Sequence, residues 1–150
     1  DFAKRYTTFG CVLNTLRSDN TTSVGHWVAL FGDFRNIGFA TIEYYNSSGN
    51  RSKDHIMNWM RQTAERYTEV TGQPCKAIDV SNIVSQKGPT ECGIYAYHYI
   101  LSRLVGVPMK KFREAPIRDE HIQRLRQIFF NDQDKLGGKV QSILRNKMML

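Results

Sequence analysis

The segment "HWVALFGDFRNIGFATIEYYNSSGN" (residues 26–50) carries the clearest structural signal in the chain. Its two runs rich in aromatic and β-branched residues, 26–34 and 39–45, are separated by the turn "RNIG", which predicts an antiparallel hairpin. The turn-forming stretch "NSSGN" then ends the second strand. In such a hairpin the start of the first strand, at His26, lies beside the end of the second, at Asn46.

The rest of the chain supplies further elements around this hairpin. Hydrophobic periodicity and turn signals predict strands at 8–14 and 75–80, the latter central in the sheet, and helices at 52–70, 90–106 and 118–130. This order predicts an α+β fold with a small, mostly antiparallel sheet and packed helices. The expected core is residues 1–130, followed by a tail, 131–150, with a short amphipathic helix.

Composition limits the class of protein. The length of 150 residues suits one domain, and no apolar run reaches the roughly 18 residues of a membrane span, so no membrane partner is expected. The net charge of +7 favours acidic partners, but the basic residues are scattered. We interpret these basic residues as solvent-exposed side chains on helix faces, and weak nucleic-acid binding is the alternative.

The number and spacing of the cysteines argue against disulfide bonds and metal sites. Cys11, Cys75 and Cys92 are odd in number and widely spaced, so they predict no disulfide framework and indicate a reducing compartment. They fit no zinc-ligand spacing, and neither a metal nor another cofactor is expected.

Cys92, in "QKGPTECGIY" (residues 86–95), is the candidate nucleophile. A thiolate is the reactive form of cysteine, and the first turn of a helix stabilises an anion. Thr90 is expected to be the N-cap and Glu91 to lie in the first turn, while Gly93 lets a substrate backbone approach the sulfur. A buried structural cysteine is the alternative.

Nucleophilic catalysis also needs a general base and a group that orients it. His26, at a strand end after a Gly-containing loop, is the best base, and Asn46 is the best orienter, with Glu43 as the alternative. The other histidines are interpreted as structural: His55, His98 and His121.

Gln86 is the candidate oxyanion donor. Its side-chain amide, with the backbone N–H of Cys92, could stabilise the oxyanion of a tetrahedral intermediate. A glutamine solvated in a loop is the alternative, and only its position relative to Cys92 singles it out.

Four blocks of sequence in register carry a family resemblance: "TFGCVLNT" (8–15), "GHWVALF" (25–31), "IEYYNSSGN" (42–50) and "TECGIY" (90–95). Together they resemble the adenain and ubiquitin-like-protein-protease clan of cysteine proteases, and within it a branch that processes viral polyproteins. The resemblance covers about Phe9 to Phe130. An Asn in place of the more usual Asp, as at Asn46, is a feature of that branch.

The resemblance implies a catalytic set of His26, Asn46 and Cys92 with Gln86 as oxyanion donor, and substrate contacts at Trp27, Gln86 and Gly93. It implies cleavage after Gly-Gly in structural polyproteins of a large DNA virus, in host-cytoplasm viral factories and the virion. The alternatives are a protease that removes ubiquitin or a ubiquitin-like modifier, and an inactive, nucleic-acid-binding module of the same fold. Nucleic acid could also assist an active enzyme, as in adenain-type relatives.

Two features at the ends of the chain depart from the family pattern. Family members carry an N-terminal arm and helices ahead of the first block, and almost nothing precedes Tyr6 here, so the expectation is either a fragment of a longer protein or a protein whose N-terminal parts are supplied elsewhere. The tail contains "LGGKV" (136–140), which resembles the family's own cleavage site at Gly137-Gly138. A loop-forming glycine pair is the preferred explanation.

Overall fold

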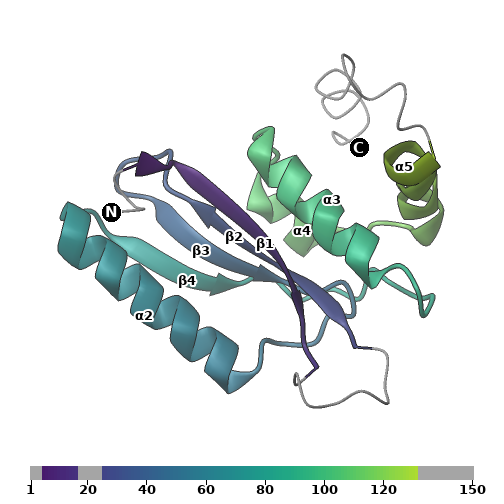
Figure 1. The fold of residues 1–150 in the computed structure, drawn as a ribbon, viewed down its shortest axis with the longest axis horizontal. Coiled ribbons are helices and arrows are strands. Elements are labelled where there is room, and N and C mark those ends of the chain that lie inside the picture. Colours follow the sequence, from purple (N-terminus) through teal and green to yellow (C-terminus); the bar gives the residue numbers. More distant parts are fainter. Residues whose placement is uncertain (1–4, 17–24, 132–150) are drawn as a thin grey trace.

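The computed structural model describes residues 5–16 and 25–131. Its elements are β1 (Thr8–Asn14), β2 (Trp27–Asp33), β3 (Ala40–Tyr45), α2 (Asp54–Thr71), β4 (Cys75–Asp79), α3 (Cys92–Leu104), α4 (Met109–Glu114) and α5 (Asp119–Asn131) (Figure 1). The predicted α+β class is confirmed. The tail helix and the Gly137-Gly138 pair lie outside the described residues.

The described sheet has the order β1-β2-β3-β4. The β1–β2 and β2–β3 pairs are antiparallel and β3–β4 is parallel, so the mostly antiparallel sheet is confirmed. The central position predicted for residues 75–80 is wrong, because β4 lies at the edge next to β3. One edge of β3 already pairs with β2. The crossover through α2 therefore adds β4 to the free edge of β3, where it becomes the outermost strand.

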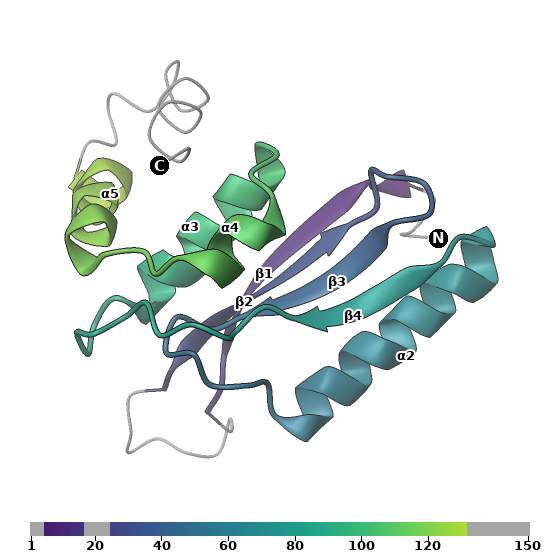
Figure 2. The same ribbon diagram turned by 180° about the vertical axis from the view of Figure 1, so that it is seen from behind.

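Helices cover both faces of the sheet. Figures 1 and 2 show α2 on one face and α3 with α4 on the other, with α5 beyond α3. Along β2, Val28 and Leu30 pack in the core on the α2 side, whereas Ala29 and Phe31 pack in the core on the α3 side. Alternate residues of a strand point to opposite faces, so burial on both faces explains why β2 is almost entirely apolar.

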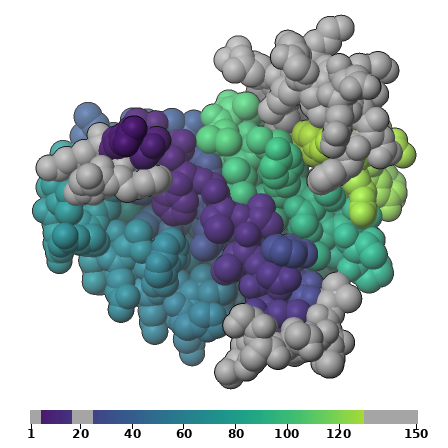
Figure 3. Space-filling model, viewed as in Figure 1, coloured from purple at the N-terminus to yellow at the C-terminus, as the bar shows by residue number. Residues whose placement is uncertain are grey.

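Two details of the helices differ from the sequence-based expectation. The short helix α4 was not predicted, because its six residues bury only Phe112 and show no full helical period. The apolar residues at helical spacing in 52–70 predict one buried face, yet Trp59 of α2 is exposed while Ile56 and Met60 are buried. Trp59 lines a groove of about 790 Å³ between α2 and β1, and β1 reaches the surface between α2 and α3 (Figure 3).

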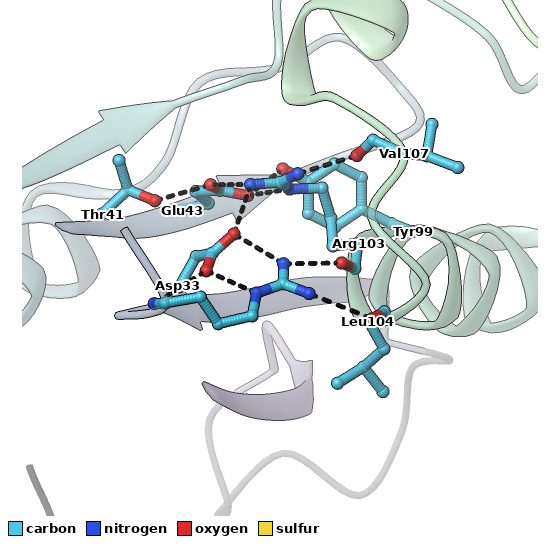
Figure 4. Close-up of polar contacts among 8 residues, drawn as sticks. Asp33, Thr41, Glu43, Tyr99, Arg103, Leu104 and Val107 are labelled. Carbon is cyan, nitrogen blue, oxygen red and sulfur yellow. Dashed lines mark hydrogen bonds and ion pairs between the residues drawn. The ribbon is translucent and has the colours of Figure 1, made fainter. Parts of the chain in front are cut away.

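A buried ionic network fastens α3 to the sheet (Figure 4). Arg103 of α3 donates to both carboxylate oxygens of Glu43 on β3, each at 2.8 Å, and to Asp33 on β2 at 3.0 Å. Tyr99 Oη donates to Glu43 at 2.6 Å, and Arg35 donates to Asp33 at 2.7 and 2.8 Å. Because α3 begins at Cys92, this network also sets where the cysteine lies relative to β2 and β3.

Candidate active site

His26 and Asn46 meet at the end of the β2–β3 pair, as the hairpin predicts. His26 Nε2 lies 2.6 Å from Asn46 Oδ1. His26 directly precedes β2 and Asn46 directly follows β3, so the antiparallel register that pairs Ala29 with Tyr45 places both at the same edge.

The hydrogen bonds of Asn46 define which way its amide faces. Its Oδ1 accepts the backbone N–H of Ser48 at 3.0 Å, a group that can only donate. Its Nδ2 donates to the backbone carbonyl of Asn50 at 3.1 Å, a group that can only accept. Oδ1 therefore faces His26, so His26 must carry a proton on Nε2. In the neutral imidazole this leaves Nδ1 as the nitrogen that can accept a proton.

The backbone around His26 is tightly held. The carbonyl of His26 accepts the N–H of Thr15 at 2.9 Å. The preceding residue, Gly25, packs against the side chain of Asn14 so closely that a Cβ at this position would overlap the amide. Any larger residue at position 25 would require the Asn14 amide or the backbone next to His26 to move.

Cys92 is the first residue of α3 and is 7% exposed. The N-cap is Glu91, with no side-chain hydrogen bond to the helix, so the predicted N-cap at Thr90 and first-turn position of Glu91 are wrong. The N-cap lies one residue later than expected, and the Glu91 carboxylate instead pairs with Arg126 at 3.3 Å. With no side chain capping it, the first turn of α3 keeps its N–H groups available to an anion.

Trp27 connects the histidine side of the site to the cysteine side. A Cβ built on Gly93 would lie 3.8 Å from Trp27 Cδ1, so the indole lies directly over this glycine. Since Trp27 follows His26 and Gly93 follows Cys92, the start of β2 and the start of α3 are neighbours. Among the described residues no hydrogen bond joins Cys92 Sγ to His26, and catalytic hydrogen bonds are often long before substrate binds.

Gln86 lies in the connection from β4 to α3, which runs along the end of the sheet (Figure 2). Its Nε2 donates to the carbonyl of Gly88 at 2.6 Å, and its Oε1 accepts Ser47 Oγ at 2.7 Å. The second amide hydrogen has no partner among the described residues. Gln86 can therefore still donate one hydrogen bond to a ligand.

The alternative orienter and the other histidines lie outside this arrangement. Glu43 is fully buried and bonded to Arg103, so it is not available to His26. His98 is buried next to His121, and burial lowers the pKa of its imidazole to about 3. His55 is exposed at the start of α2.

Sequence reasoning missed the residues that hold the site in place. Ser47, Ser48 and Asn50 were assigned only to a turn, yet they bond to Gln86 and Asn46. The signal was the density of short polar side chains in "NSSGN", which is greater than a turn requires. Gly49 between them has a φ of 74° and packs against Val84, so this position of the turn also requires glycine.

The described residues offer neither a metal centre nor a membrane span. In the described ranges, no group of three or more His, Cys, Asp and Glu side chains is placed to hold a metal ion. No helix within them combines the length and the apolar character needed to cross a membrane. All three cysteines are free thiols.

The α+β fold, with a cysteine at a helix N-terminus beside an asparagine-bound histidine, is that of a cysteine-type peptidase. The chain belongs to the Ulp1 protease family, because its residues 20–140 match the C-terminal catalytic domain of that family.

Viral proteins are similar to this chain along most of its length. The SUMO-1 cysteine protease S273R of African swine fever virus is 40% identical over 124 residues, which are 82% of this chain and 44% of that protein. R355 of Acanthamoeba polyphaga mimivirus is 28% identical over 108 residues, 72% of this chain and 34% of that protein. The crystal structure of the selenomethionine form of the African swine fever virus pS273R protease matches with a TM-score of 0.72 at 38% identity, covering 80% of this chain and 43% of that one. The chain thus spans less than half the length of these relatives.

Proposed function

We propose that this chain is the catalytic part of a cysteine endopeptidase that cleaves after Gly-Gly and processes the structural polyproteins of a large DNA virus. The observation that carries the proposal is the 2.6 Å contact between His26 Nε2 and Asn46 Oδ1, next to Cys92 at the start of α3. The family membership supports the chemistry, and the similarity to proteases of large DNA viruses supports the setting. In this proposal the protein acts in viral factories of the host cytoplasm and in the virion.

In this proposal each side chain of the site has a role in the reaction. His26 Nδ1 takes the proton of the Cys92 thiol, and the thiolate attacks the carbonyl carbon of the scissile bond. The oxyanion accepts hydrogen bonds from the backbone N–H of Cys92 and the free amide hydrogen of Gln86. His26 then gives its proton to the leaving amine, and a water molecule, deprotonated by His26, hydrolyses the thioester.

Trp27 and Gly93 support the Gly-Gly preference. The indole lies over Gly93 beside the nucleophile and is 40% exposed, so it forms one wall of the approach to the sulfur. A bulky or branched side chain next to the scissile bond would need the space that the indole occupies. Residues without a side chain pass beneath it.

A second candidate uses the same chemistry on a folded substrate. Ubiquitin-like modifiers also end in Gly-Gly, and the African swine fever virus relative is described as a SUMO-1 cysteine protease, which favours a deconjugating protease as the alternative.

The net charge of +7 supports nucleic acid as an accessory partner. In that case turnover rises with added DNA at low salt, and a response that does not change with salt would contradict it.

Cleavage of matched peptides tests the proposal. A Gly-Gly-Xaa peptide is expected to be cleaved and an Ala-Ala-Xaa peptide of the same length to be left intact, with all activity lost in Cys92→Ala. A modifier fused through its Gly-Gly terminus separates the two candidates, because a deconjugating enzyme cleaves the fusion with a much lower KM than the peptide. If a folded protein cleaves neither substrate, the proposal is wrong.

A further inference from the structure

Ser47 is a buried serine at the centre of the site that neither strand pairing nor the turn explains. It lies between Asn46 and Ser48 and is almost fully buried. Its carbonyl accepts the backbone N–H groups of Ser85 and Gln86, each at 2.9 Å. Its hydroxyl lies 2.7 Å from Oε1 of Gln86. Ser47 therefore contacts both the backbone and the side chain of the oxyanion donor.

The direction of the hydroxyl bond follows from the other end of the amide. Nε2 of Gln86 lies 2.6 Å from the carbonyl of Gly88, which can only accept, so Nε2 is the amino group and Oε1 faces Ser47. Ser47 Oγ must then donate. The amide is held at both ends, which leaves one N–H with a defined direction.

Ser48 does the equivalent for the other half of the site. Its hydroxyl and its backbone N–H both donate to Asn46 Oδ1, at 2.8 and 3.0 Å, and Asn50 Nδ2 donates in turn to the hydroxyl at 3.0 Å. Adjacent serines thus reach two different amides, one belonging to the proposed oxyanion donor and one to the proposed orienter of the base.

We propose that Ser47 is a positioning residue for the reaction: its hydroxyl orients the Gln86 amide so that its free N–H points at the oxyanion. The proposal rests on the proposed function of Gln86. Ser48 has the separate task of orienting Asn46. The turn after β3 then positions both the proposed oxyanion donor and the proposed orienter of the base.

The backbone that carries Gln86 has a second support, independent of the Ser47 hydroxyl. Asp119, at the start of α5, accepts the N–H of Lys87 at 3.1 Å and of Gly88 at 2.9 Å. Tyr95 Oη also donates to Asp119 at 2.6 Å. Removal of one hydroxyl at Ser47 leaves these contacts and its own carbonyl contacts in place. Ser47→Ala is therefore expected to fold.

A double-mutant cycle on peptide cleavage tests the assignment. Gln86→Ala is expected to lower kcat by about 100-fold, as for the loss of an oxyanion donor, and Ser47→Ala by about tenfold. The double variant is expected to be no slower than Gln86→Ala alone, because Ser47 acts only through that amide. Ser48→Ala is the matched control, and its loss is expected to multiply with that of Gln86→Ala.

Alkylation of Cys92 by iodoacetamide gives a readout without an oxyanion. The adduct is located by mass spectrometry, because the exposed thiol of Cys11 also reacts with iodoacetamide. Ser47→Ala and Gln86→Ala are expected to alkylate at the wild-type rate, whereas Ser48→Ala changes the pH dependence of alkylation through Asn46 and His26. A general structural defect at Ser47 would slow alkylation as well.

The results for the Ser47, Gln86 and Cys92 variants test three separate claims. Losses in Ser47→Ala and Gln86→Ala that multiply, or slower alkylation in Ser47→Ala, would overturn the positioning role of Ser47 while leaving that of Gln86 intact. If Gln86→Ala cleaves at the wild-type rate, both the oxyanion role and the inference that depends on it are wrong. If Cys92→Ala keeps activity, the proposed function itself fails.

Discussion

Replacement of Arg103 by Met is the perturbation whose effect the structure defines best. Glu43 is 0% exposed, and both of its oxygens accept from the guanidinium of Arg103 at 2.8 Å. Met has a similar length and no charge, so Arg103→Met keeps most of the packing and leaves the Glu43 carboxylate buried with only the hydroxyls of Tyr99 and Thr41.

The magnitude follows from the cost of a buried charge without its partner. Loss of one member of a buried ion pair costs about 3–5 kcal/mol in the free energy of unfolding. The carbonyl of Val107 also loses its donor, which lies at 2.7 Å. Asp33 keeps Arg35, so its carboxylate is not left alone. Because a whole domain is stable by only about 5–15 kcal/mol, Arg103→Met is expected to lie close to the unfolding limit.

Urea denaturation at pH 7 measures this loss. Arg66→Met is the matched control, because the Arg66–Glu69 pair is on the surface with 76% of the arginine side chain exposed, and no measurable change is expected there. Arg103→Met combined with Glu43→Leu is expected to regain most of the stability, since the uncompensated charge is gone. A loss below about 1 kcal/mol in Arg103→Met would show that the buried Glu43 carboxylate does not need its partner.

Three further predictions concern the site and the core. Gly25→Ala is expected to lower kcat about tenfold or more with folding retained, because a Cβ there overlaps the Asn14 amide and the shift that follows disturbs the backbone next to His26. An unchanged kcat in steady-state kinetics would contradict this. Asn46→Ala is expected to slow cleavage less than His26→Ala, since the base remains, and equal losses would show that Asn46 does more than orient. Burial lowers the pKa of His98 from 6.5 to about 3, so the native state disfavours protonation of its imidazole. The free energy of unfolding therefore falls by about 1.4 kcal/mol per pH unit as the pH drops below about 6.5. Urea titrations at pH 7 and pH 5 should show this slope reduced in His98→Leu, and an equal slope in the variant would rule out His98 as its source.

The sequence alone predicted the hairpin and the contact that depends on it. The patterns of 26–34 and 39–45 reflect local preferences, and the antiparallel register follows from a short turn. The proximity of His26 to Asn46 required no other part of the chain. The same holds for the helix that begins near Cys92, which was placed correctly to within two residues.

Other features depended on segments that are far apart in the chain. Glu43 was a reasonable orienter by its position on β3, but Arg103, 60 residues later, accounts for its carboxylate. Trp27 reaches Gly93, and Ser47 reaches Gln86, only because α3 and its leading connection fold back over the end of the sheet. No local pattern encodes these contacts.

Local sequence patterns therefore predicted the four strands, the three longer helices and the hairpin, because hydrophobic period and turn chemistry act over a few neighbouring residues; the short helix α4 left no such pattern. Long-range packing accounts for the edge position of β4, for the pairing of Glu43 with Arg103, and for the contacts of two adjacent serines with the amides of Gln86 and Asn46. The physical reason is that packing of α3 against the sheet selects partners by shape, burial and hydrogen-bond capacity across the whole chain.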